Sequence, residues 1–123
     1  MSIRASAEDY LETILLLSRK MGAVRSIDIV EEMGFSKPSV SVAMKKLRET
    51  QMIEMDSDGF ITLTATGLEA AEAVYARHST IYDWLVKNGV SANIAALDAC
   101  RMEHIISEET FQLIKYLLAE EGK

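Results

Sequence analysis

Apolar residues recur through the first fifty positions at the spacing of one helix face, with polar residues between them. The pattern predicts three helices, the first opened by Ser6, over about residues 6–22, 26–33 and 38–50. Only Gly34, Phe35 and Ser36 separate the second helix from the third. Two helices joined by so short a turn containing glycine are typical of a helix-turn-helix, whose second helix enters the major groove of DNA.

A β-hairpin is predicted directly after these helices. Two short β-prone runs, 53–55 and 60–63, flank Asp58-Gly59, the strongest short hairpin signal. A helix-turn-helix followed at once by a hairpin is typical of a winged helix. The hairpin carries Glu54, Asp56 and Asp58 but no lysine or arginine, so we do not expect it to grip DNA phosphates.

The rest of the chain predicts three further helices. They begin near Thr66, Ser91 and Ser107, and the first of them is marked by the capping-box pair Thr66 and Glu69 and runs to about Asn88. The last helix is apolar over more than one face, which exceeds what a small N-terminal domain could cover. We therefore expect a homodimer.

Composition and charge limit the class of protein to which this chain can belong. The chain of 123 residues is 49% hydrophobic and 26% charged, which is globular, and its single cysteine cannot form an internal disulfide. With no signal-like or membrane-spanning run, we expect a cytoplasmic protein. The net charge of −6 argues against indiscriminate coating of nucleic acid, so DNA binding would have to be local.

Positive charge is concentrated on the third predicted helix. Lys37, Lys45 and Arg48 lie opposite its apolar stripe, although any amphipathic surface helix can show this pattern. With the winged-helix pattern beside it, we expect this face to contact double-stranded DNA. The predicted contact residues are Ser36, Lys37, Pro38, Ser39, Ser41, Val42 and Lys45.

Cys100, Glu103 and His104 recur at i, i+3 and i+4, so on a helix they share one face. A thiol, a carboxylate and an imidazole together form a borderline donor set that suits a divalent transition metal. The alternative is a buried cysteine beside two exposed polar residues.

Four motifs together resemble one family, the metal-dependent repressors that include the diphtheria toxin repressor and the manganese transport regulator. They are EDYLE (8–12), SKPSVS (36–41), YARH (75–78) and DACRMEH (98–104). The resemblance covers essentially the whole chain, in a two-domain form without the SH3-like C-terminal domain. It implies a metal-activated repressor that regulates metal homeostasis by binding palindromic operator DNA as a homodimer.

The resemblance also implies the fold and the ligands. The expected fold is mostly α, with a winged helix-turn-helix domain over residues 1–65 and a helical metal-binding and dimerisation domain over 66–123. The implied metal ligands are Asp9, Glu12, His78, Cys100, Glu103 and His104. Four anionic ligands, with Cys100 as thiolate, would balance two divalent cations.

The sequence does not decide whether the activating ion is Fe(II) or Mn(II). Cys100 resembles the iron-responsive branch, whereas Asp9 and Glu12 resemble the manganese-responsive branch. One or two ions per subunit are expected, with Co(II), Ni(II) or Zn(II) as surrogates. Tyr82 and Ala96 stand where the iron branch has ligands of an ancillary site, so we do not expect that site here.

Two other functions compete with a repressor. An enzyme is not expected, because the two histidines are not spaced i, i+4 as in a zinc-protease helix, and catalysis needs an open metal position and a positioned base. A winged-helix regulator that senses oxidation through Cys100, without metal, is the main alternative.

Overall fold

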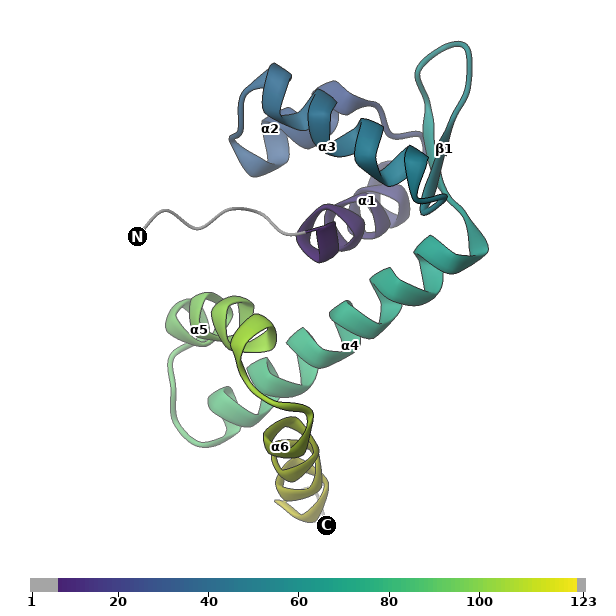
Figure 1. Cartoon of the computed structure of the whole chain (residues 1–123). Coiled ribbons are helices and arrows are strands. Elements are labelled where there is room, and N and C mark those ends of the chain that lie inside the picture. The colour runs from purple at the N-terminus through teal and green to yellow at the C-terminus, as the bar shows by residue number, and fades with distance from the viewer. Residues whose placement is uncertain (1–6, 122–123) are drawn as a thin grey trace. The chain divides into compact units, whose positions relative to one another are not determined.

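Six helices and one hairpin make up the computed structural model of the protein, which describes residues 7–121 (Figure 1). In chain order they are α1 (Ala7–Met21), α2 (Ser26–Met33), α3 (Lys37–Glu49), β1 (Ile53–Met55), β2 (Ile61–Leu63), α4 (Ala65–Lys87), α5 (Ala92–Ile105) and α6 (Glu108–Glu121). The prediction of a mostly α fold with an N-terminal winged helix-turn-helix is confirmed. Ser6, predicted to open the first helix, lies outside the described residues.

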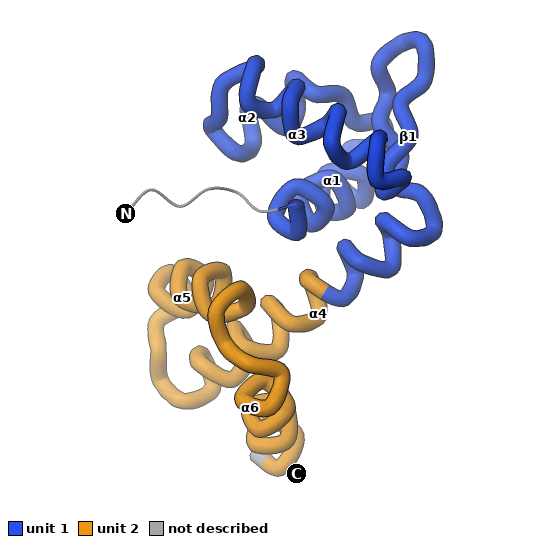
Figure 2. The backbone as a smooth tube through the Cα atoms, viewed as in Figure 1, with its two compact units in different colours: residues 1–73 blue, residues 74–123 orange. Residues whose placement is uncertain are grey.

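The chain divides into two compact units, Met1–Ala73 and Val74–Lys123, coloured separately in Figure 2. The division falls within α4, so this helix contributes to both units. The domain boundary expected between residues 65 and 66 stays a prediction.

The core of the first unit forms where the apolar faces of α1, α2 and α3 meet the inner face of the hairpin. Its most deeply buried large side chains are Ile14, Val24, Ile29, Val40, Met44, Ile53 and Ile61. Val40, Met44 and Leu47 recur at i, i+4 and i+7, so α3 buries one face and leaves the other exposed.

Local chemistry fixes the turn between α2 and α3. Gly34 ends α2 in the left-handed conformation, with φ of 74°, and its N–H donates to the Val30 carbonyl. Ser36 caps α3, because its hydroxyl accepts the Ser39 N–H at 3.2 Å, and Pro38 stands in the first turn, where no N–H is needed. The predicted helix-turn-helix geometry follows from these caps.

The hairpin pairs Ile53 with Leu63 and Met55 with Ile61. Asp56 organises its turn, since its Oδ1 accepts the N–H groups of Asp58 and Phe60, each at 2.9 Å. Phe60 was predicted to open the second strand, but β2 starts at Ile61. The Phe60 N–H is taken by the Asp56 side chain, and its ring lies 4.2 Å from the Arg25 guanidinium.

The start of α4 is anchored to the end of α3 and the hairpin by Thr64. Its hydroxyl accepts the Gly67 N–H at 3.1 Å and donates to the Gln51 carbonyl at 2.7 Å. The N-cap of α4 is therefore Thr64. The capping-box spacing had indicated Thr66, and that prediction is wrong. Thr64 is favoured as the cap because its hydroxyl also donates to a carbonyl thirteen residues away, a contact that local spacing does not reveal.

None of the helices within residues 7–121 combines the length and the apolar character needed to cross a membrane.

Gly67 is predicted to be essential to this anchor. A Cβ added there would lie 1.9 Å from the Met52 carbonyl oxygen, a backbone atom that accepts the Thr64 N–H and cannot easily move. Gly67→Ala should lower the free energy of unfolding by about 2 kcal/mol or more, because this overlap outweighs the better helix propensity of alanine. Urea unfolding measures the change.

Thr66→Ala, at an exposed position in the same turn, is the matched control and should change stability by less than about 0.5 kcal/mol. Equal stability of Gly67→Ala and the wild type would contradict the close approach.

Candidate metal centre and nucleic-acid interface

The inner face of α4 carries His78. Val74, His78 and Ile81 recur at i, i+4 and i+7, and Val74 and Ile81 are buried in the second unit. The His78 side chain is 26% exposed. The predicted ligand His78 thus lies on the face of α4 that packs inward, with part of its ring still open to solvent.

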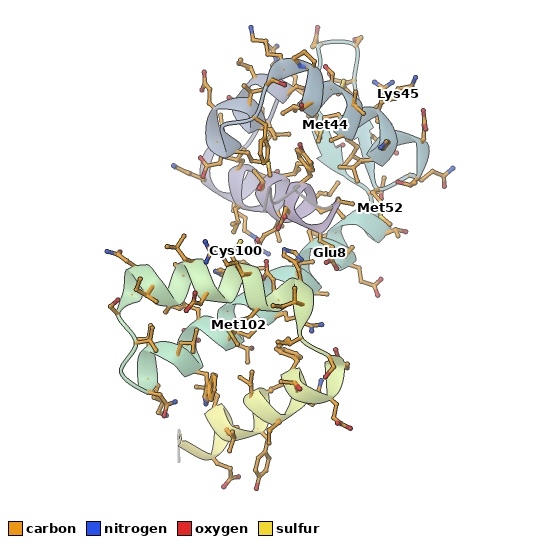
Figure 3. All side chains as sticks on the ribbon, turned by 60° about the vertical axis from the view of Figure 1, so that its left-hand side comes forward. Glu8, Met44, Lys45, Met52, Cys100 and Met102 are labelled. Atoms are coloured by element: carbon orange, nitrogen blue, oxygen red, sulfur yellow. The ribbon has the colours of Figure 1, made fainter. Side chains whose placement is uncertain are left out.

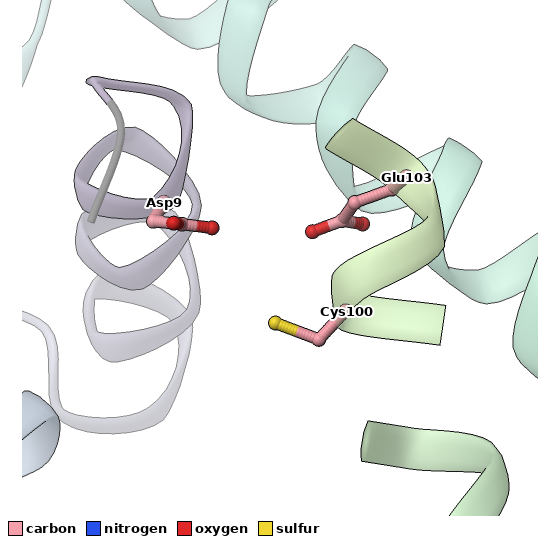
Figure 4. Close-up of side chains that lie close together, drawn as sticks. All are labelled: Asp9, Cys100 and Glu103. Atoms are coloured by element: carbon pink, nitrogen blue, oxygen red, sulfur yellow. The ribbon is translucent and has the colours of Figure 1, made fainter. Parts of the chain in front are cut away.

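The face of α5 that is buried carries Ala95, Ala99 and Glu103, each one helical turn apart. Cys100 and Glu103 project from the same side of α5 in Figure 4, and the Cys100 Sγ and a Glu103 carboxylate oxygen lie within 4.8 Å. Cys100 itself is exposed. The alternative interpretation of a buried core cysteine is therefore wrong.

Glu103 is the centre of the donors in the second unit. Its side chain is 1% exposed, and its two oxygens lie 3.4 Å from His78 Nδ1 and 3.3 Å from His104 Nε2. Among the described residues, neither oxygen accepts a hydrogen bond of proper geometry. A buried carboxylate with no hydrogen bond is costly, and a divalent cation beside it would offset that cost. The residues of the second unit therefore fit a metal ion.

Two more predicted ligands, Asp9 and Glu12, lie in the first unit at i and i+3 on α1. Both are half-buried, and Asp9 projects from the first turn of α1 in Figure 4. Next to it, burial of the Tyr10 phenol, and secondarily the negative charge of Asp9, raise the pKa of Tyr10 above its usual value. Asp9 and Glu12 thus supply two carboxylates that α1 keeps only partly open to solvent.

The exposed face of α3 carries the predicted DNA contacts. Lys37, Ser41 and Lys45 recur every fourth residue and are exposed, while Met44 beside Lys45 points into the core (Figure 3). Val42 is also on this outer surface, 55% exposed. The remaining members gather at the N-terminus of the helix: Ser36, Pro38 and Ser39. The helix presents cations, hydroxyls and one apolar side chain together, as a groove-reading helix requires.

Arg77 has contacts that no sequence pattern indicated. It stands beside His78 on α4 and binds residues 29 and 31 positions further along the chain. The motif YARH contained it, but no local spacing connects an arginine to partners so distant.

Two protein-family models match this chain, one in each half. The model described as "Iron dependent repressor, N-terminal DNA binding domain" matches residues 2–61. The model described as "Iron dependent repressor, metal binding and dimerisation domain" matches residues 64–120. Both halves of the chain are thus assigned to one kind of protein.

Individual proteins are similar over nearly the whole chain. The transcriptional regulator MntR of Escherichia coli O6:H1 is 35% identical over 119 residues, 97% of this chain and 77% of that protein. An HTH-type transcriptional regulator of Methanocaldococcus jannaschii is 29% identical, covering 92% of both chains. A solved manganese-dependent transcriptional repressor in complex with manganese is 28% identical with a TM-score of 0.84. The match covers 93% of this chain but 53% of the solved one, so this chain spans about half its length.

Replacing Glu103 should separate metal binding from stability. Glu103→Gln keeps the shape but removes a buried charge, so the metal-free protein should be at least as stable as the wild type. The affinity for Co(II) should fall at least about 10-fold, because losing a ligand costs no less than losing one of its outer partners. Absorption titration of chelator-treated protein and urea unfolding give the two readouts.

Glu109→Gln, on the exposed first turn of α6, is the control and should change neither quantity. Equal Co(II) affinity in Glu103→Gln and the wild type would exclude Glu103 as a ligand.

Proposed function

Because the chain belongs to the family of iron dependent repressors, we propose that it is a transcriptional repressor activated by a divalent metal ion. It binds palindromic operator DNA as a homodimer and regulates metal homeostasis in the cytoplasm. The observation that carries this proposal is the Glu103 carboxylate, buried between two imidazoles with no hydrogen bond among the described residues. A buried carboxylate without a hydrogen bond is typical of a functional site, here one that binds a cation.

The proposed ligands come from three helices. His78 of α4 and Cys100, Glu103 and His104 of α5 form the part of the site in the second unit. Asp9 and Glu12 of α1, in the first unit, are the other two proposed ligands. A bound divalent cation supplies positive charge that offsets the negative charge of the carboxylates.

Fe(II) and Mn(II) are the proposed activating ions, with one or two bound per subunit. The carboxylates suit either ion, while the Cys100 thiolate strengthens binding of the later and softer one, Fe(II). The related regulator solved with manganese supports Mn(II) as the other choice.

Dimerisation is proposed to use the apolar surface that α5 and α6 leave exposed. Its members are Ile94, Leu97, Ile105, Leu113 and Tyr116, which are between 50% and 78% exposed. An exposed apolar surface of this kind marks an interface. A two-fold dimer would place its α3 helices on half-sites about one helical turn apart, or a multiple of that, which is why a palindrome is proposed.

The outer face of α3 is proposed to enter the major groove, with Lys37 and Lys45 on phosphates. The acidic hairpin is not part of this contact. Asp56 has a structural role there, because it holds the turn through two N–H groups. An acidic hairpin would repel phosphates rather than bind them.

An enzyme and an oxidation sensor are not proposed. The family consists of transcriptional regulators, which argues against an enzyme. The oxidation sensor is not supported, since the relatives include a manganese-dependent repressor and the matching domain model is described as metal-binding.

Lys45→Ala tests the DNA face. Removing one phosphate contact should weaken binding to every sequence alike and reduce the slope of log affinity against log salt by about one unit. Fluorescence anisotropy of duplexes at several salt concentrations, with metal present, measures the slope. Lys87→Ala, at the end of α4, is the control and should leave the slope unchanged. The same slope in Lys45→Ala as in the wild type would remove Lys45 from the interface.

Cys100→Glu tests the choice of metal. It replaces a soft donor by a hard one, so the DNA-binding response to Fe(II) should weaken relative to Mn(II), with fold and dimer retained. Wild-type protein loaded with Co(II) should show a sulfur charge-transfer band that the variant lacks. If the wild type has no such band and the variant responds identically to both metals, Cys100 is not a ligand.

A further inference from the structure

The guanidinium of Arg77 joins α4 to the corner between α5 and α6. Its Nη2 donates to the Ile106 carbonyl at 2.7 Å, its Nη1 lies 3.4 Å from the Glu108 carboxylate, and its Cζ lies 5.0 Å from the centre of the Phe111 ring. We propose that Arg77 is a positioning residue of the metal centre, which holds the ligands of α5 at a fixed place relative to His78. This inference rests on the metal-binding function proposed above.

The ligands of α5 need such support because they lie at its end. Glu103 and His104 stand in the last turn of α5, which ends at Ile105. The last turn of a helix frays, since its carbonyls have no partner within the helix. Fraying there would move both ligands away from His78. The bond from Arg77 to the Ile106 carbonyl holds the chain two residues after His104.

The other end of the link stands next to a ligand. Arg77 precedes His78 on α4, so any shift of the corner against Arg77 changes the distance between His78 and Glu103. A metal centre tolerates little displacement of its donors, and residues that only orient ligands typically contribute 10–100-fold to metal affinity. The Arg77 link is therefore placed where it controls the geometry of the site.

The chemistry of the contacts requires a guanidinium. One planar group donates to a carbonyl, approaches a carboxylate and stacks on a ring, and its side chain is 24% exposed. A lysine ammonium is a point charge on a flexible stem and cannot make these contacts together. Arg77→Lys keeps the charge and removes the link, which makes it a sharp test.

The experiment compares chelator-treated wild type, Arg77→Lys and the control Arg101→Lys, which changes an exposed arginine of α5. Co(II) titration followed by absorption gives the affinity and the ligand-field spectrum, and urea unfolding gives the stability without metal. Arg77→Lys should lower Co(II) affinity at least about 10-fold and alter the ligand-field bands, whereas Arg101→Lys should match the wild type. A purely structural role would change stability but leave the spectrum of the bound ion unaltered.

Each outcome decides. Wild-type affinity and spectrum in Arg77→Lys would overturn the positioning role while leaving the metal-binding function intact. Failure of the wild type itself to bind Co(II) would overturn both. Should Arg77→Lys not fold, Phe111→Leu removes the ring from the same link. A weakened affinity with altered bands then supports the role, and an unchanged titration rejects it.

Discussion

The Glu103 carboxylate, almost fully buried beside His78 and His104, is the constraint on which the rest of the second unit depends. Moving a carboxylate out of water without hydrogen bonds costs roughly several kcal/mol, unless a nearby cation compensates its negative charge. The helices around it are arranged to present further donors, with His78 on the inner face of α4 and Cys100 one turn before Glu103. The chain therefore carries a destabilising group at the place where binding energy can be recovered, and this is what a metal-dependent switch requires.

The second structural feature on which the proposed switch depends is α4, which belongs to both compact units. Its first turn is anchored by Thr64 and by the close approach of Gly67 to Met52, and further along it carries Arg77 and His78. One continuous helix thus connects the winged helix with the proposed ligands of the second unit. The proposed switch needs this connection, because metal binding can change DNA affinity only if the two units respond to the same ion.

Much of this arrangement could be predicted from the sequence, because helices and the hairpin leave periodic and local signals. Helices α2 to α6 begin within a residue or two of the predicted positions, and Cys100, Glu103 and His104 lie on one helix, α5, as their spacing indicated. Contacts between distant segments could not be predicted. The Thr64 hydroxyl, which caps α4, also donates to a carbonyl thirteen residues earlier, whereas local spacing had indicated Thr66. Arg77 binds the carbonyl of Ile106, a contact that no local spacing indicates. Cys100 also turned out to be exposed, which composition alone does not decide.

Metal-dependent DNA affinity tests the central claim most directly. A labelled operator duplex, selected from random sequences in the presence of metal, is titrated with chelator-treated protein while free Mn(II) or Fe(II) is buffered from none to saturation. The account predicts that DNA affinity rises at least about 10-fold with metal, and that bound operator raises metal affinity by the same factor. An operator affinity that is the same in chelator as in saturating metal would contradict it.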